Sequence, residues 1–190
     1  MEKVAIIGVG NFGAAMAHLL SKGKHEVALW DADTTKVPDQ GSLEEVLSGA
    51  HIIFLCVSSW SLREAAVSIQ KHLAPGAIVI CPTKGIEQET LKTSDEVLQD
   101  VLKDTATVAL LHGPMLAAEI IQNLPAFSVL AVSSKDKFNR VAAVFAESHL
   151  HLEYSSDVHG VALAGVLKNI YSIGLGMTSA LALGSNFRGW

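Results

Sequence analysis

Cysteine and charged residues are scarce in this 190-residue chain, and each scarcity excludes a class of protein. The two cysteines, Cys56 and Cys81, lie inside apolar runs, so we expect buried thiols and no disulfide framework. Charged residues make up 17% of the chain and hydrophobic residues 49%, a balance that suits a sheet buried on both faces. The net charge of −5, without any basic run, argues against nucleic-acid or anionic-membrane partners, and we expect no metal site.

The sequence pattern also lacks a signal peptide and an uninterrupted membrane-spanning segment. The N-terminus has the pattern of a strand, and it lacks the charged segment and apolar helix of a signal peptide. No apolar run reaches membrane-spanning length without a polar interruption. Internal repeats and low-complexity linkers are also absent. We therefore expect a soluble, cytoplasmic protein that does not contact a membrane.

The start of the chain carries the most informative motif. Residues 4–7 form a β-branched, strand-like run that leads directly into Gly8, Gly10 and Gly13, and a helix-forming stretch follows over residues 14–21. In a dinucleotide-binding turn, the first glycine permits the tight strand-to-helix turn and the second leaves room for a pyrophosphate. The third lets the helix pack closely on the strand, and the helix N-terminus offers N–H groups to the phosphates. The motif therefore predicts a dinucleotide site.

Apolar strand-like runs alternate with helical patterns along most of the chain. This alternation predicts an α/β fold of the Rossmann type, with a doubly wound, mostly parallel sheet and right-handed crossovers. The expected strands are residues 4–7, 26–30, 52–57, 78–81, 107–111, 128–132 and 150–154. The expected helices in this part are residues 14–21, 42–47, 62–73, 94–102 and 135–147.

The last part of the chain differs in character. Residues 158–183 are rich in Ala, Gly and Leu and are apolar around much of a helical circumference, so such a helix needs cover on several sides. We expect residues 1–156 to form the dinucleotide-binding domain and residues 157–190 to begin a helical substrate domain, truncated here. The chain by itself is then expected to bind cofactor but to catalyse weakly or not at all. A homodimer that covers the apolar helix is a further possibility.

Asp31 ends the second expected strand, 18 residues after Gly13. An acidic residue there can accept hydrogen bonds from the adenosine ribose and repel a 2′-phosphate, which favours NAD over NADP. Lys36 is the nearby cation that argues the other way. A solvated turn residue is the alternative interpretation, because Asp favours turns.

Two further segments follow strand-like runs and should therefore reach the carboxyl edge of the sheet. Lys84 follows residues 78–81 and can hold an anionic substrate or the cofactor, although an exposed loop lysine is equally consistent with its position. His112 and Gly113 follow residues 107–111, and the glycine gives a ligand access to the backbone. His112 by itself is more typical of a hydrogen-bonded or solvated histidine than of a catalyst.

Lys168 interrupts the apolar helix, where an unpaired charge is costly. One interpretation is a lysine that extends its ammonium to solvent at the helix edge. The other is a partly desolvated lysine with a lowered pKa, able to exchange a proton with a substrate hydroxyl. Asn169 beside it can orient the same oxygen.

Four segments together resemble the NAD(P)-dependent glycerol-3-phosphate dehydrogenase family. The resemblance implies NAD-linked interconversion of dihydroxyacetone phosphate and sn-glycerol 3-phosphate, a small phosphorylated substrate. The segments are Gly8-Val9-Gly10-Asn11-Phe12-Gly13, Thr83-Lys84-Gly85-Ile86-Glu87, Gly113-Pro114-Met115-Leu116-Ala117-Ala118-Glu119 and Gly160-Val161-Ala162-Leu163-Ala164-Gly165-Val166-Leu167-Lys168-Asn169.

The resemblance also implies a role for individual residues. Lys168 matches the family's proton-transferring lysine, and Lys84 matches the lysine that reaches both cofactor and substrate. Gly113 matches a position that contacts the substrate. The implied cofactor contacts are Asn11, Phe12, Ala117 and Glu119.

Three departures from the family pattern keep other functions open. Met115 stands where the family usually has Ser or Thr near the substrate, residues 32–41 are shorter than the family's excursion, and Ser185 replaces an acid. A related dehydrogenase that acts on another small hydroxy or keto acid or phosphate is one alternative. A dinucleotide-binding module without catalysis is the other.

Overall fold

Seven strands form one sheet in this computed structural model, which describes residues 2–189. The strand order is β2-β1-β3-β4-β5-β6-β7, and every neighbouring pair is parallel except β5 and β6. This is the doubly wound, mostly parallel sheet that the sequence predicts. The strands are β1 (Lys3–Ile7), β2 (Glu26–Trp30), β3 (Ile52–Leu55), β4 (Ala77–Cys81), β5 (Ala106–His112), β6 (Ala126–Ala131) and β7 (Leu150–Ser155).

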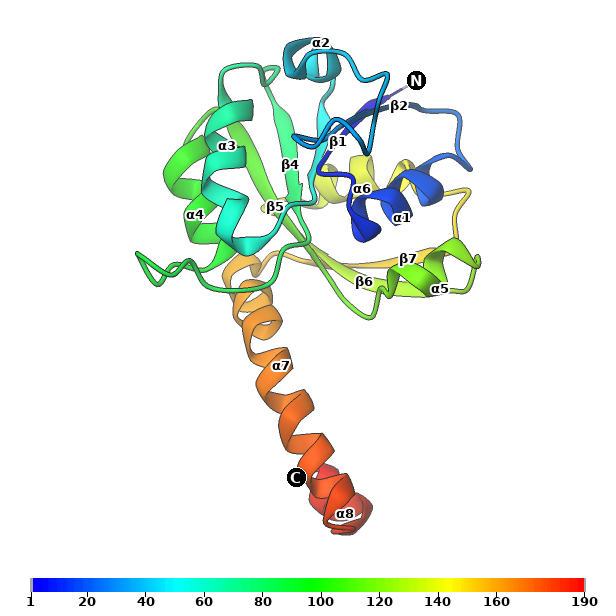
Figure 1. The fold of residues 1–190 in the computed structure, drawn as a ribbon, viewed down its shortest axis with the longest axis vertical. Coiled ribbons are helices and arrows are strands. Elements are labelled where there is room, and N and C mark those ends of the chain that lie inside the picture. The colour runs from blue at the N-terminus through cyan, green and yellow to red at the C-terminus, as the bar shows by residue number, and fades with distance from the viewer. Residues whose placement is uncertain (1, 190) are drawn as a thin grey trace.

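Helices cover both faces of the sheet because successive strand residues point to opposite sides. Ile6 packs in the core with α1 and α6, whereas its neighbour Ile7 packs with α2, α3 and α4 on the other face. Figure 1 shows α3 and α4 on one side of the strands and α1 and α6 on the other. The helices are α1 (Asn11–Leu20), α2 (Leu43–Leu47), α3 (Leu62–Gln70), α4 (Ser94–Leu102), α5 (Ala117–Ile121), α6 (Lys135–Ala143), α7 (Val158–Ala180) and α8 (Gly184–Gly189), with a 3₁₀ turn, η1 (Ser59–Ser61), before α3.

The helix starts follow from local sequence. Ser42 and Glu45 form a capping box at α2, and Thr93 and Glu96 form another at α4, so two orphan N–H groups are satisfied at each start. The Asp157 carboxylate accepts a 2.8 Å hydrogen bond from the Gly160 N–H and begins α7. The five-residue α5 is the one helix of the sheet domain, among the described residues, that the sequence pattern does not predict.

The two cysteines are free thiols, as expected. Cys81 is buried at the end of β4, and Cys56 is half-buried just after β3. Burial raises the pKa of both thiols, to about 11 for Cys81. Neither thiol is therefore a reactive nucleophile at neutral pH.

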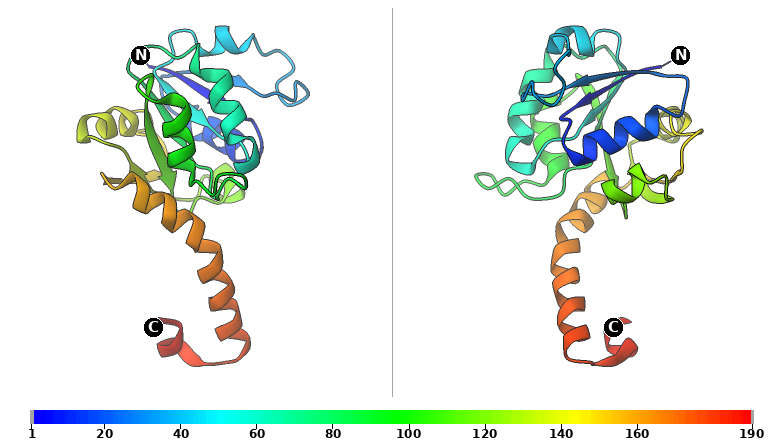
Figure 2. Two further views of the ribbon diagram at one scale, coloured as in Figure 1. Left: turned by 90° about the vertical axis from the view of Figure 1, so that its left-hand side faces the viewer. Right: turned by 45° about the vertical axis from the view of Figure 1, so that its right-hand side comes forward.

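Helix α7 projects away from the sheet, as Figures 1 and 2 show. Its first turns pack on β5 and α4, and only Ala162 and Gly165 are buried. The rest of the helix presents large apolar side chains to solvent, as a helix that needs further cover would. These exposed residues of α7 are Leu163, Leu167, Ile170, Tyr171, Ile173, Leu175 and Met177.

By length and composition alone, α7 is also sufficient to cross a membrane. It has 23 residues with a mean hydropathy of 1.3 over its most apolar window, despite Lys168 and Asn169. The sequence prediction concerned apolar runs without a polar interruption, and Lys168 and Asn169 interrupt this helix, so the prediction is not contradicted. One such helix is weak evidence for a membrane, because core helices of globular domains have the same length and composition.

Candidate functional site

The glycine turn between β1 and α1 opens toward solvent at one position and is closed at the other two. Gly8 has a φ of +93°, and a Cβ there would lie 2.5 Å from the Cys56 carbonyl oxygen. A Cβ on Gly13 would lie 2.0 Å from the Gly8 carbonyl oxygen, so both positions require glycine for packing. Around Gly10, in contrast, no atom lies within 4 Å of an added Cβ. Gly10 therefore faces open space, as a glycine that admits a ligand should.

A cavity of about 480 Å³ lies in front of this turn, at the carboxyl ends of β1, β2 and β3. Ligands of doubly wound folds bind at this edge of the sheet. Gly10 is the N-cap of α1 and provides no side chain to cap it, so the first N–H groups of the helix are available to an anion. The polar residues that line the cavity are Asp31, Lys36, Ser58, Ser61, Glu64 and Ser68.

Asp31 is buried at the edge of this cavity and already has partners. Its carboxylate accepts hydrogen bonds from the N–H of Val9 (2.6 Å) and Asp33 (2.9 Å), and Lys36 lies 3.3 Å away. Burial alone would raise the pKa of Asp31, but the two N–H donors and Lys36 hold it below the ordinary value. The solvated-turn interpretation of Asp31 is thus wrong. The carboxylate joins the end of β2 to the glycine turn.

Lys84 lines a second, smaller cavity of about 270 Å³ that shares Cys56 and Val57 with the first. Phe12 and Met115 provide apolar walls from two other parts of the chain. The pKa of Lys84 is lowered, first by burial and then by the nearby charge of Lys168. The sheet therefore places a half-buried cation beside the glycine turn.

The segment that carries Lys84 is fixed on its N-terminal side. The Thr83 hydroxyl donates a 2.6 Å hydrogen bond to the Val57 carbonyl. The ring nitrogens of buried His112 lie 3.2 Å from the Thr83 carbonyl and 3.0 Å from the Val161 carbonyl in α7. Burial lowers the pKa of His112, and Lys84 contributes to this effect. His112 thus lies between the Lys84 segment and α7, and the one N–H of its neutral ring donates to either the Thr83 or the Val161 carbonyl.

Gly165 lets α7 approach this group. A Cβ at Gly165 would lie 2.5 Å from Nδ1 of His112 and 3.5 Å from Cγ of Lys84. Lys84 therefore passes alongside Gly165, one helical turn before Lys168. Lys168 itself is exposed, so the expectation of a partly desolvated Lys168 is not met in this structure. Lys84 is the half-buried lysine of the pair.

Several other predicted residues lie apart from these two cavities. Gly113 packs against β6, where a Cβ would meet the Phe127 carbonyl oxygen at 2.2 Å, so close backbone approach requires this glycine. It lines a third cavity of about 340 Å³ with His112, Phe127 and His151. Asn11, Ala117, Glu119 and Asn169 line none of the three cavities.

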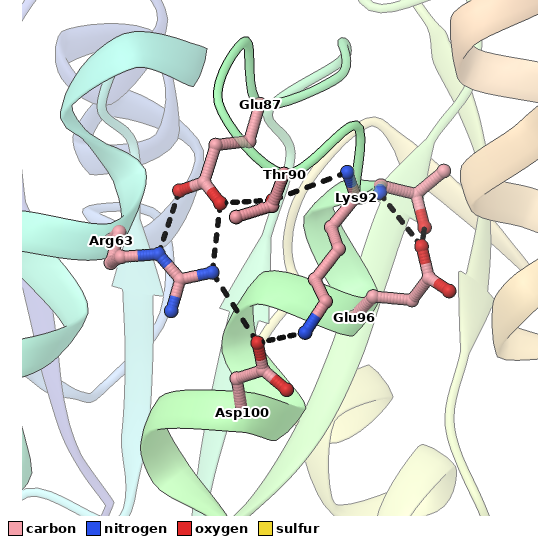
Figure 3. Close-up of polar contacts among 7 residues, drawn as sticks. Arg63, Glu87, Thr90, Lys92, Glu96 and Asp100 are labelled. Carbon is pink, nitrogen blue, oxygen red and sulfur yellow. Dashed lines mark hydrogen bonds and ion pairs between the residues drawn. The ribbon is translucent and has the colours of Figure 1, made fainter.

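Sequence reasoning did not single out α3 as part of the site. Glu64 lies in the first turn of α3 and lines the larger cavity. Its neighbour Arg63 forms two hydrogen bonds with Glu87, just beyond Lys84 (Figure 3). The position of α3 after the carboxyl end of β3 is the sequence signal that could have indicated this.

These features define a class of protein: a Rossmann-type dinucleotide-binding domain with a cationic pocket beside its glycine turn. The chain belongs to the NAD-dependent glycerol-3-phosphate dehydrogenase family. The model of that family's N-terminus matches residues 3–40 and 34–138, and the model of its C-terminus matches residues 157–190. Helix α7 therefore falls within the family's C-terminal region.

Individual relatives agree with this assignment. The chain is 31% identical to a glycerol-3-phosphate dehydrogenase [NAD(P)+] of Citrifermentans bemidjiense and 34% identical to that of Teredinibacter turnerae. These matches cover 98% and 97% of this chain but 63% and 60% of the relatives' own length. The chain thus spans about three-fifths of the curated relatives it matches.

Solved structures show the same fold. The glycerol-3-phosphate dehydrogenase of Coxiella burnetii superposes with a TM-score of 0.83 at 25% identity, over 99% of this chain and 64% of that one. A 3-hydroxyisobutyrate dehydrogenase of Mycobacterium tuberculosis has a TM-score of 0.73 at 13% identity, over 97% of this chain and 67% of that one. The second likeness shows the fold alone.

Proposed function

We propose that this protein is a glycerol-3-phosphate dehydrogenase, which interconverts dihydroxyacetone phosphate and sn-glycerol 3-phosphate with NAD(H). One observation carries the proposal. Half-buried Lys84 lines a cavity next to the glycine turn, and Lys168 is close enough to depress its pKa. A pair of cations beside a dinucleotide turn suits a small phosphorylated ketone. The family assignment supports the same substrate class.

The residues present fit a nicotinamide dinucleotide. Gly10 leaves open space for a pyrophosphate, and the uncapped start of α1 offers N–H groups to it. The larger cavity can take the adenosine half, with Asp31 beside the ribose, and the Lys84 cavity can take the nicotinamide. The proposed cofactor contacts are Gly8, Gly10, Asn11, Phe12, Gly13, Asp31, Lys84, Ala117 and Glu119.

The two lysines would divide the chemistry between them. A bound nicotinamide supplies or accepts the hydride at the substrate carbon. Protonated Lys168 stabilises the alkoxide that develops on the substrate oxygen and then donates its proton to it, and neutral Lys168 accepts the proton in the reverse direction. Lys84 binds the anionic substrate at the cavity wall, and Asn169 orients the substrate oxygen.

A substrate panel tests this assignment in the full-length protein. Dihydroxyacetone phosphate, dihydroxyacetone and a small 3-keto acid are offered with NADH, and the oxidation of NADH is followed by absorbance. The proposal expects turnover of the phosphorylated ketone and little turnover of the other two. Reduction of the keto acid alone would refute the substrate but keep the enzyme class.

One observation favours a second candidate substrate. Met115 is buried and places an apolar wall in the Lys84 cavity, where a hydroxyl side chain would give a polar substrate another partner. A dehydrogenase that acts on a less polar hydroxy or keto acid is the alternative. A protein that binds NADH and reduces no compound of the panel would instead be a non-catalytic dinucleotide-binding module.

The domain boundary, the cofactor preference, the cellular location and the oligomeric state belong to the same proposal. We assign residues 1–156 to the dinucleotide domain and residues 157–190 to the substrate domain. The start of the C-terminal family match at residue 157 supports this division, and the N-terminal match ends at residue 138. We also propose that NAD is preferred over NADP and that the enzyme works in the cytoplasm. A homodimer that covers the apolar face of α7 is tested by the mass of the full-length protein in solution, and a clean monomer would rule it out.

A further inference from the structure

The segment that follows Lys84 is a closed loop rather than a free excursion. Gly85 has a φ of +139°, which turns the chain sharply after Lys84. Ile86 and Thr93 then form an antiparallel bridge, and the Glu87 N–H donates a 2.8 Å hydrogen bond to the Lys92 carbonyl. Residues 85–93 thus return to the start of α4. The position of this loop limits where Lys84 can lie.

Two ion pairs attach the loop to the surrounding helices, as Figure 3 shows. Nε and Nη2 of Arg63 donate hydrogen bonds of 2.7 and 2.8 Å to the two carboxylate oxygens of Glu87. Nη2 also lies 3.4 Å from Asp100 in α4, and Lys92 of the loop pairs with the same carboxylate. Arg63 therefore connects α3, the loop and α4.

The Arg63–Glu87 pair differs from an ordinary surface ion pair. The Glu87 side chain is only 11% exposed and its bonds with Arg63 are bidentate, a geometry that fixes direction as well as distance. Hydrogen bonding with Arg63 holds the pKa of Glu87 at about 2. Without Arg63, this mostly enclosed carboxylate would lose its main cationic partner and move toward water. That movement would displace the loop.

The Arg63–Glu87 pair also links two segments that line the two different cavities. Arg63 and Glu64 are adjacent in the first turn of α3, and Glu64 lines the larger cavity. Glu87 lies three residues after Lys84, which lines the smaller one. Adjacent residues of one helix turn thus contribute to the wall of the first cavity and bind the loop that follows the lysine of the second.

We propose that the Arg63–Glu87 pair is a positioning device that holds Lys84 in its half-buried place between the smaller cavity and α7. This deepens the proposed function, because Lys84 is the lysine that the proposed reaction uses. Arg63 and Glu87 line neither cavity, so they act through the loop rather than on a substrate.

The test measures Lys84 directly, by NMR of ¹³C-methylated lysines in the full-length protein, with the Lys84 signal assigned from its loss in K84R. The pKa of Lys84 is read in the wild type, in R63Q and in R63K. The charged and titratable groups that act on Lys84 are Lys168 of α7, Cys81 of β4 and His112 of β5, and none of these is altered. The measurement needs neither cofactor nor turnover.

R140Q is the matched control. Arg140 makes an equally bidentate pair with Glu2 on the opposite face of the sheet, with bonds of 2.7 and 3.1 Å, and its side chain is 38% exposed against 37% for Arg63. Loss of either pair should lower the melting temperature, and R63Q should lower it more because it also removes the contact with Asp100. Only loss of the Arg63 pair should move Lys84.

The expected result is a Lys84 pKa that rises toward the ordinary lysine value in R63Q and does not change in R140Q. R63K should show a smaller rise, because lysine cannot form the bidentate pair. Amide hydrogen exchange of residues 85–93 should accelerate on the order of tenfold in R63Q alone. If R63Q fails to fold, E87Q is read in its place. An unchanged Lys84 pKa in a folded R63Q or E87Q would overturn the proposal, whether or not the protein reduces dihydroxyacetone phosphate.

Discussion

The Val9 N–H donates a 2.6 Å hydrogen bond to the Asp31 carboxylate, so the glycine turn and the end of β2 are held together by one buried side chain. We therefore propose two roles for Asp31. It fixes the backbone that would cradle a pyrophosphate, and it places negative charge where an adenosine ribose would lie. Lys36 offsets part of that charge. In the proposed dinucleotide site, the preference between NAD and NADP should therefore depend on both side chains.

Replacement of Asp31 by Asn should weaken NADH binding by roughly tenfold, since a charged acceptor is lost from both the turn and the ribose site. NADPH binding should change less, so the preference for NADH should narrow. Fluorescence titration with both cofactors measures this effect. D33N is the control, because Asp33 is exposed and lines neither cavity. An unchanged NADH to NADPH ratio in D31N would contradict the assignment.

The glycines of the turn should separate folding from binding. Gly10→Ala should leave stability within about 0.5 kcal/mol, because nothing lies near the added Cβ, yet it should weaken NADH binding at least tenfold. Gly13→Ala should instead destabilise the fold, because its Cβ would meet the Gly8 carbonyl. Urea unfolding and NADH titration of both variants measure the two effects. Full NADH affinity in Gly10→Ala would argue against a pyrophosphate at this position.

The approach of α7 to the site should be sensitive to Gly165. Gly165→Ala would push its Cβ into His112 and should cost about 1–3 kcal/mol, with a loss of order around Lys84. Gly174→Ala in the same helix has open space around it and should be neutral or stabilising by up to about 1 kcal/mol. Chemical denaturation of the two variants gives the comparison. Equal effects would show that the contact with His112 does not matter.

Stability in acid should depend on Glu87. Its pKa is about 2 in the folded protein, because of Arg63, against an ordinary value of 4.5. Its stabilising contribution is therefore complete above pH 4.5 and is lost as the pH falls toward 2. E87Q should be less stable than the wild type at pH 7, and the difference should shrink in acid. Urea unfolding from pH 7 to pH 2 measures it, with the exposed neighbour E89Q as the control.

The sheet could be predicted from sequence because its strands are short apolar runs and its turn is marked by Gly8, Gly10 and Gly13. Both signals are local, so they do not depend on knowing what packs against what. Helix α5 lacked such a signal, since five residues are too few to show helical periodicity. The antiparallel step between β5 and β6 likewise depends on the path of the chain around this helix.

The charges of the site were harder to predict. Lys168 appears in sequence as the costly charge in an apolar helix, but the structure leaves it exposed and half-buries Lys84, because α7 packs alongside Lys84 at Gly165. The Arg63–Glu87 pair joins residues 24 positions apart, and no local pattern indicates it. Burial and pairing of charges are tertiary properties, which a single sequence does not contain.

The central claim is that Lys84 and Lys168 serve an NADH-linked reduction of a phosphorylated ketone. The most direct measurement is the steady-state reduction of dihydroxyacetone phosphate by the full-length protein and by its K84A and K168A variants. We expect each variant to lose at least about 100-fold in kcat/KM. K168A should keep its NADH affinity within about threefold, since Lys168 lines neither cavity. The claim would be contradicted if both variants kept the kcat/KM of the wild type, or if the wild type itself did not oxidise NADH.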